Sequence, residues 1–363
     1  MRRSILTLLQ GGLLCAQIPI AALGQMAPAT GKNAATVPGI AVPGKTNATI
    51  TEFEVPGEGA KPEGIFSSKH DGFTWYTAEG ANEIGRFDPK KKAFEQFHLR
   101  PGTRPSTLVE HSGSGVQSTL YFASRDGGYI GEFDPNTRDV REFRIPGGKA
   151  RLESLGFDHN GVIWFTVAKA EPPEFPQGSK VGRLNLFSSE IRTADVPTRN
   201  ASPYGLAVNS KGTIFFTERD TARIGSVEAD PMKVREYLLP KAGIGVEGLT
   251  ITPDDALWFT DGARGYLGRF EPETGKFDEW SSPSGRGSRP GPIASIGGVV
   301  WYIETGTKPN MLVRFDTASD QFQSWAIPDN ATVGHLYAES DSTLWLSLPA
   351  SNHIAQVKVE AAK

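Results

Sequence analysis

The stretch "WFTDGARGYLGRF" at residues 258–270 decides the fold, because the chain repeats it with small changes. It returns as "FFTERDTARIGSV" at 215–227 and as "WYTAEGANEIGRF" at 75–87. Its opening pair of large apolar residues, mostly aromatic, occurs seven times, with spacings of 43 to 51 residues, at positions 75, 121, 164, 215, 258, 301 and 345. Internal repeats of this length are typical of solenoids and propellers.

Each repeat contains more than this phrase. A small apolar segment such as "GLTI" precedes it, an "IGRF"-like segment follows, and most repeats then have an aromatic residue shortly before a proline, as in "EYLLP" ending at Pro240. Short apolar runs separated by Gly, Asp, Asn and Pro predict strands of about five residues. Four strands in each of seven repeats predict an all-β, seven-bladed β-propeller with four-stranded antiparallel blades. The repeated tryptophans are expected to pack between blades.

The seventh repeat ends at Lys363 without its fourth strand. The missing piece stands at the other end of the chain, as "EFEVP" at 52–56. We expect Thr51–Pro56 to pair with a strand at about 353–359, so that the N-terminal strand closes the last blade and covers its edge. Residues 48–363 then form one propeller domain.

The N-terminus has the pattern of an export signal. Arg2 and Arg3 precede a mostly apolar stretch, and small residues precede Gln25. We expect a signal peptide at 1–25, a flexible Ala-, Pro- and Gly-rich linker at 26–47, and a periplasmic or secreted protein. The apolar stretch is interrupted by glutamines, so no membrane span is expected. Cys15, the only cysteine, lies in this signal, and a mature chain without it forms no disulfide.

Composition narrows the class of partner. The formal net charge is −3, so no basic excess suggests nucleic acid. No phosphate-binding loop, dinucleotide fingerprint or nucleophile-elbow motif occurs in a supporting context. We expect a monomer that binds a small molecule.

Two positions in each repeat are predicted to face one mouth of the central channel. We call the residue that enters the innermost strand the leading position and the last residue of the second strand the trailing position. The leading positions are Glu63, Ser106, Glu153, Tyr204, Glu247, Gly291 and His335. The trailing positions are Ala78, Ser124, Val167, Glu218, Asp261, Glu304 and Leu348.

These positions are rich in acids, with one histidine among them. Like charges around a narrow ring recruit a cation or raise carboxyl pKa values. We therefore predict a Mg²⁺ or Ca²⁺ site whose ligands are Glu218, Glu247, Asp261 and Glu304. His335, expected near Glu304, is the predicted general base. The alternative is ion pairing of these acids with arginines of the surface loops, which has little functional consequence.

Arginines surround the same mouth. Arg104, Arg151 and Arg289 stand two residues before leading positions, and Arg125 and Arg219 directly follow trailing positions. Together with Tyr204 they are the predicted binding residues for an anionic ligand or an acidic partner.

The combination of "WFT", "IGR" and "EY-LP" at this period resembles the virginiamycin B lyase (streptogramin lyase) family of seven-bladed propellers, over residues 50–363. The resemblance implies an enzyme that opens a cyclic depsipeptide by elimination across its ester C–O bond, using Mg²⁺, acidic ligands and histidines at the mouth. In the family pattern the last two repeats have a leading histidine. The last repeat also has one Glu two residues before that histidine and another just after its second strand.

This sequence departs from that pattern. His335 is taken as the match of the last histidine, but Gly291 replaces the other histidine and Val333 replaces the first Glu. No acid follows the second strand in "WLSLPAS". Three hypotheses therefore stay open: a metal-assisted lyase on a cyclic ester, a binding propeller without catalysis, and a lactonase-type hydrolase.

Overall fold

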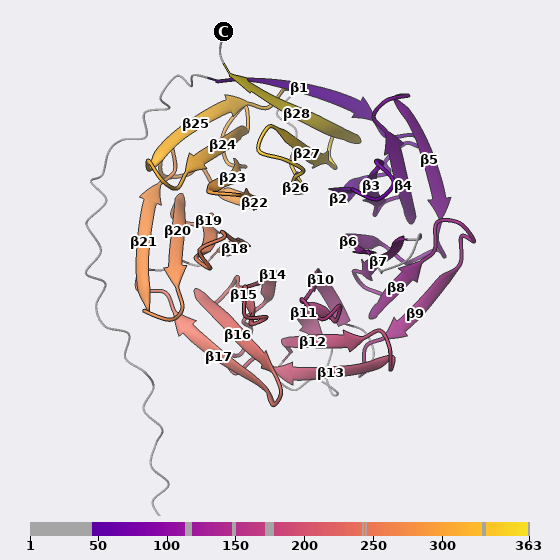
Figure 1. Ribbon diagram of the computed structural model, residues 1–363, viewed down its shortest axis with the longest axis horizontal. Helices are drawn as coiled ribbons and strands as arrows, with labels where there is room; N and C mark the ends of the chain where they lie inside the picture. Colours follow the sequence, from indigo (N-terminus) through magenta and orange to yellow (C-terminus); the bar gives the residue numbers. More distant parts are fainter. Residues whose placement is uncertain are drawn as a thin grey trace, which may run out of the picture.

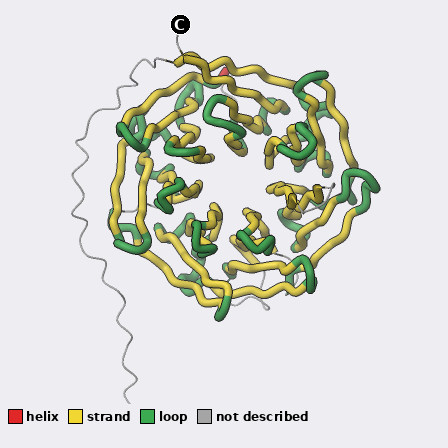
Figure 2. The backbone as a smooth tube through the Cα atoms, in the orientation of Figure 1, coloured by secondary structure: helices red, strands yellow, loops and turns green. Residues whose placement is uncertain are grey.

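The computed structural model describes residues 46–112, 118–146, 150–170, 178–241, 243, 245–328 and 332–361. The strands form seven four-stranded sheets, which Figure 1 shows arranged as a ring around a central axis. Figure 2 shows that turns join these strands throughout the ring. The predicted all-β, seven-bladed propeller is confirmed. The expected signal peptide and most of the expected linker lie outside the described residues, and Thr46 and Asn47 already belong to the first strand.

The strands occupy four concentric positions in the ring (Figure 1). The innermost strands are β2 Pro62–Ser67, β6 Pro105–Ser112, β10 Ala150–Phe157, β14 Pro203–Val208, β18 Val246–Ile251, β22 Pro290–Ile296 and β26 His335–Ala338. The second strands are β3 Thr74–Ala78, β7 Ser118–Ser124, β11 Ile163–Ala170, β15 Ile214–Glu218, β19 Leu257–Asp261, β23 Val299–Glu304 and β27 Thr343–Leu348. Blades are numbered 1 to 7 in this order.

The third and fourth strands complete each blade. The third strands are β4 Glu83–Asp88, β8 Tyr129–Phe133, β12 Lys180–Asn185, β16 Arg223–Ala229, β20 Tyr266–Glu271, β24 Met311–Asp316 and β28 His353–Ala361. The outermost strands are β5 Ala93–His98, β9 Val140–Arg144, β13 Glu190–Asp195, β17 Met232–Leu238, β21 Lys276–Ser281, β25 Gln321–Ala326 and, for blade 7, β1 Thr46–Glu54.

The repeated phrase is explained by two aromatic side chains that point to opposite faces of the second strand. In blade 5, Trp258 packs against Phe315 of blade 6, and Phe259 lies across Gly268 of its own sheet. A Cβ at Gly268 would overlap the Phe259 ring, so the glycine of "LGRF" makes room for it. Alternating side chains along a strand allow one short segment to fill both interfaces. The inter-blade tryptophans are buried as predicted.

A hydroxyl completes the link between neighbouring blades. Thr260 Oγ1 accepts the N–H of Gly248 in its own blade and donates to the Gly291 carbonyl of the next, at 3.0 and 2.8 Å. Thr77 and Thr217 repeat the arrangement with Ser106 and Glu247. The threonine of "WFT" therefore fixes the start of the next innermost strand.

The N-terminal strand closes the ring as predicted, over a longer stretch than expected. β1 pairs with β28 from Thr46–Ala361 to Glu54–His353. Phe53 also reaches blade 1, where its ring lies 4.5 Å from that of Phe87. This one side chain therefore joins the two ends of the ring.

We predict that Phe53→Ala lowers the free energy of unfolding by about 2–4 kcal/mol, because it removes a large aromatic contact at the closure. Phe187→Ala is the matched control, since that ring is fully exposed and its loss is expected to change stability by less than about 0.5 kcal/mol. Chemical denaturation of both variants measures the difference. Equal stability of the two would show that the closure does not depend on Phe53.

Candidate functional site

One mouth of the channel is formed where innermost strands begin and second strands end. In blades 1, 2, 4, 5 and 6 the ladder between these two strands shifts register directly after its first pair, as between Pro62–Ala78 and Ile65–Tyr76. In blade 3 the corresponding shift lies between Leu152–Val167 and Leu155–Phe165. Two residues of the innermost strand then oppose one of its partner, which defines a β-bulge. Bulges re-aim side chains, and here the bulged pair includes the leading residue.

The innermost strand of blade 7 begins differently. Its ladder pairs His335 with Ser347 and shows no register shift. The His335 N–H binds Ser347 Oγ at 2.8 Å, the bond that Gly64 makes with Thr77 and Gly205 with Thr217. His335 therefore occupies the position after the leading one.

Gly334 is the leading residue of blade 7, so the sequence placed His335 one position too early. The spacing to the second strand agrees: Tyr204 stands eleven residues before Phe215, and Gly334 stands eleven residues before Trp345. His335 is still exposed at the channel. Desolvation by the surrounding protein lowers the pKa of its imidazole, partly offset by a hydrogen bond to the Ile65 backbone. The ring is thus poised to be neutral at pH 7.

Three of the four predicted metal ligands point into the blades. Glu218, Asp261 and Glu304 are fully buried. Glu304 accepts hydrogen bonds from Ser282 and Ser284, which follow the outermost strand β21, and its carboxylate is not brought to His335. Strand alternation explains why these acids do not face the mouth as predicted. Where the trailing side chain points into the blade, the side chain of the next residue points to the mouth.

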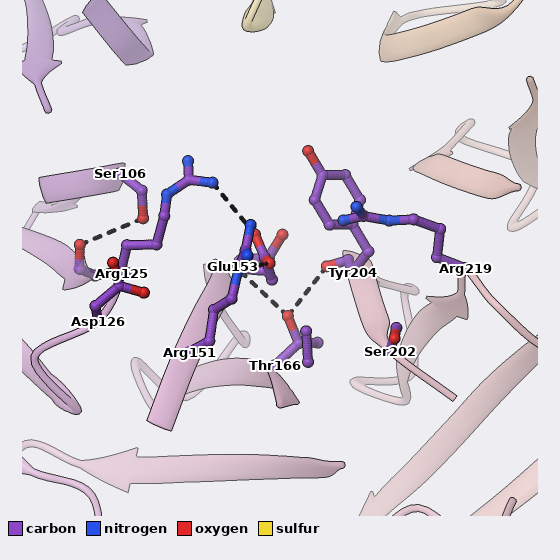
Figure 3. Close-up of polar contacts among 12 residues, drawn as sticks. Ser106, Arg125, Asp126, Arg151, Glu153, Thr166, Ser202, Tyr204 and Arg219 are labelled. Carbon is purple, nitrogen blue, oxygen red and sulfur yellow. Dashed lines mark hydrogen bonds and ion pairs between the residues drawn. The ribbon is translucent and has the colours of Figure 1, made fainter. Parts of the chain in front are cut away.

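The residues directly after the trailing positions form the charged centre of the mouth. Arg125 lies among three carboxylates, at 3.3 Å from Glu79, 3.8 Å from Glu63 and 3.8 Å from Glu153. Figure 3 shows its guanidinium on the channel side of the strands. Desolvation raises the pKa of Glu63; Arg125 opposes this, and the neighbouring carboxylates add to it. Glu79 was not among the predicted binding residues, although it shares its repeat position with Arg125.

A second group lies beside this centre. The Arg219 guanidinium covers the Tyr204 ring at 3.9 Å, and its Nε is 3.9 Å from Glu247 (Figure 3). Desolvation raises the pKa of the Tyr204 hydroxyl, so it stays protonated and can donate a hydrogen bond. The structure thus brings together Arg125, Tyr204 and Arg219, three of the predicted binding residues.

The other predicted arginines lie at the rim. Arg151 binds Glu153 at 2.6 Å, and Arg104 binds both Glu79 and Asp126. Arg289 is exposed. Arg104 and Arg289 adopt left-handed backbone conformations, with φ of 46° and 50°, in the turns that lead to their innermost strands. These arginines hold carboxylates or border the mouth, and do not form its centre.

The donor set does not fit the implied Mg²⁺ or Ca²⁺ ion. Hard cations take six or more oxygen ligands around one point. Of the four predicted ligands only Glu247 lies at the mouth, beside Arg219. Within the described part of the chain, no three or more His, Cys, Asp or Glu residues are grouped so that they could hold a metal ion.

The comparisons with known proteins agree with this architecture. The profile of the Virginiamycin B lyase family matches residues 112–362. The chain belongs to the virginiamycin B lyase family. No curated protein sequence matches it. No helix of the described residues is long and apolar enough to cross a membrane.

Solved structures of lyases share the fold. A streptogramin B lyase is 24% identical with a TM-score of 0.75, and the match covers 86% of this chain and 98% of that one. A catalytically inactive histidine-to-alanine variant of virginiamycin B lyase from Staphylococcus aureus, with quinupristin, is 22% identical with a TM-score of 0.75, covering 86% and 99%. The extracellular domain of a putative one-component system from B. thetaiotaomicron is 14% identical with a TM-score of 0.61, covering 86% and 42%.

Glu218, the trailing acid of blade 4, lacks the arginine partner that its counterpart Asp261 has in blade 5. In blade 5, Arg264 bridges Asp261 and Glu279. In blade 4 the corresponding acids are Glu218 and Glu236, and Thr221 stands where the bridging arginine would be. Burial, and secondarily Glu236, raises the pKa of Glu218 to about 8, although Thr221 and Arg223 oppose the shift. The Thr198 N–H and hydroxyl bind Glu236, and one Glu218 oxygen has no hydrogen-bond partner.

This pair predicts a loss of stability as pH rises. A carboxyl with a folded pKa of about 8 keeps its proton in the native state from pH 4.5 to 8, whereas the unfolded chain releases it. Unfolding therefore becomes easier across this window, by roughly 5 kcal/mol in all. We expect Glu218→Gln to flatten the dependence between pH 5 and 8 in denaturant titrations. Thr221→Arg, which supplies the bridging cation of blade 5, is expected to flatten it as well; an unchanged slope in both would contradict this account.

Proposed function

We propose that this protein is a binding propeller whose mouth captures a small organic anion through Arg125, Tyr204 and Arg219. The observation that supports this most is the loose coordination of the two guanidinium groups. The Nε atoms of Arg125 and Arg219 are buried and make no aligned hydrogen bond. Buried polar atoms are nearly always satisfied, so an unpaired donor indicates that a water or ligand completes it.

The charges around Arg125 permit an exchange of partners. Its carboxylate contacts range from 3.3 to 3.8 Å, longer than the 2.7–2.9 Å of a strong charge-assisted hydrogen bond. A ligand carboxylate placed 2.7–2.9 Å from the guanidinium donors would form the short bonds that the protein carboxylates do not form. The raised pKa of Glu63 lets that side chain take up a proton when a ligand anion arrives.

Small leading residues in blades 6 and 7, beside the carboxylates of Glu247 and Glu63, leave room at the mouth for the rest of a ligand. The leading residues of blades 6 and 7 are Gly291 and Gly334, and neither has a positive φ that would require glycine. A Cβ on Gly291 would be 3.4 Å from Thr305, an ordinary contact, whereas a Cβ on Gly334 would lie 2.9 Å from Glu63 Oε2, so Gly334 makes room for that carboxylate. Glycine at these positions therefore serves space and not backbone geometry.

Calorimetric titration of succinate into the purified protein tests this site. We expect Arg125→Gln and Arg219→Gln each to weaken binding about tenfold or more, because each removes charge-assisted bonds worth about 1.5–3 kcal/mol. Arg138→Gln is the control, since Arg138 lies at an outer turn, paired with Glu95. Equal affinity in all three variants, or no binding by the wild type, would reject the proposed anion site.

A second candidate function is elimination on a cyclic ester with His335 as the base. Two findings favour it: the histidine is exposed at the channel with a lowered pKa, and the family includes a lyase that a single histidine-to-alanine change inactivates. The leading glycines of blades 6 and 7 oppose it, because the resemblance implies histidines there. Neither candidate is routed through a metal ion. The N-terminal pattern supports export in either case.

Incubation with quinupristin distinguishes the two functions. We expect no ring opening by the wild type at pH 7 with added Mg²⁺, as followed by mass spectrometry. Ring opening that disappears in His335→Ala would instead establish the lyase and displace the binding proposal.

A further inference from the structure

A cleft of about 1040 Å³ lies between blades 4 and 5, away from the mouth. It is bordered by the turn from Asn209 to Thr213 and by Asp254 and Asp255. These turns join strand ends opposite to the leading and trailing positions, so the cleft opens on the other face of the ring. Lys211 and Glu273 form an ion pair across its rim.

Blade 4 lacks the tryptophan and arginine that stand at this place in blades 1, 3, 5 and 6. In blade 1, Arg86 lies 5.5 Å from the ring of Trp75, and in blade 5 Arg269 lies 5.9 Å from that of Trp258. The tryptophan comes from the second strand and the arginine from the third. Blade 4 has a phenylalanine and a serine at these positions.

The residues of blade 4 form one cross-strand row. Phe215 pairs with Ser226, and Ser226 with Arg235 of the outermost strand. All three line the cleft. Because cross-strand partners share a face of the sheet, the row presents a ring, a hydroxyl and a guanidinium in sequence.

Arg235 is the cation left for a ligand. It is exposed, its guanidinium lies 4.8 Å from the Tyr237 ring, and no carboxylate of the described residues lies within ion-pair distance. The other cations differ: Arg269 is paired with Asp254 and Glu271. Lys211 is held by Glu273, and Lys233 faces Glu228 in the ladder.

We propose that this cleft binds a small aromatic carboxylate. Its ring would lie against Phe215, in the space that tryptophan and arginine occupy in other blades. Its carboxylate would pair with Arg235, whose planar fork suits two parallel hydrogen bonds. Ser226 is smaller than the arginine of blades 1, 3, 5 and 6, so no long side chain stands between Phe215 and Arg235 in this row.

Calorimetry with 2-naphthoate and its neutral analogue 2-naphthylmethanol tests both halves of this recognition. The wild type is expected to bind 2-naphthoate at least tenfold more tightly than the alcohol. Ser226→Arg restores the side chain of the other blades, fills the cleft and should abolish binding. Arg235→Gln should reduce the affinity for 2-naphthoate to that for the alcohol.

Arg192→Gln is the matched control. Arg192 has the same ladder position in blade 3, where Trp164 and Arg183 fill the corresponding space. This variant should bind 2-naphthoate like the wild type, and thermal melting confirms that each variant is folded. No binding by the folded wild type, or equal binding by folded Ser226→Arg, would overturn the proposal; so would an unchanged preference for the anion in Arg235→Gln.

Discussion

The structure depends on the contact between each second strand and the blade that follows it. In blade 5 this contact consists of the Trp258 ring and the Thr260 hydroxyl, which donates to the Gly291 carbonyl near the start of the next innermost strand. The Trp258 ring fills the space between the two blades, and the Thr260 hydroxyl fixes where the innermost strand of the next blade begins. Because the hydroxyl is buried, its bonds are costly to leave unmade, and the relative position of the blades is fixed. The mouth inherits its geometry from this repeated bond.

We expect function at the positions where the residue type differs from blade to blade. The leading positions vary from acid to tyrosine to glycine while the strands beneath them hardly change. The mouth carries Arg125 and its carboxylates at blades 1 to 3 but glycines at the leading positions of blades 6 and 7, so the blades share their strand pattern but not their chemistry. The cleft of blade 4 follows the same rule, since Phe215 and Ser226 replace larger residues without altering the ladder.

The acids at the trailing positions are buried in each of three blades, but a different set of neighbouring groups stabilises each acid. Asp261 forms an ion pair with Arg264, Glu304 accepts hydrogen bonds from serine hydroxyls, and burial raises the pKa of Glu218 to about 8. The burial is the same in all three, and the local partner decides how the charge is accommodated. None of the three reaches the channel, although each of them directly precedes in sequence a residue at the mouth.

The sequence alone determined the seven blades, their four strands and the closure by the N-terminal strand, because period and alternation are properties of the chain. It also found Arg125, Tyr204 and Arg219, since their repeat positions place them at one mouth. Only the tertiary structure decided which way the neighbouring side chains point. His335 lies one residue after the leading position of blade 7, and strand alternation turned Glu218, Asp261 and Glu304 inward. Side-chain direction reverses with every residue of a strand, so a single bulge or strand end changes what a site contains.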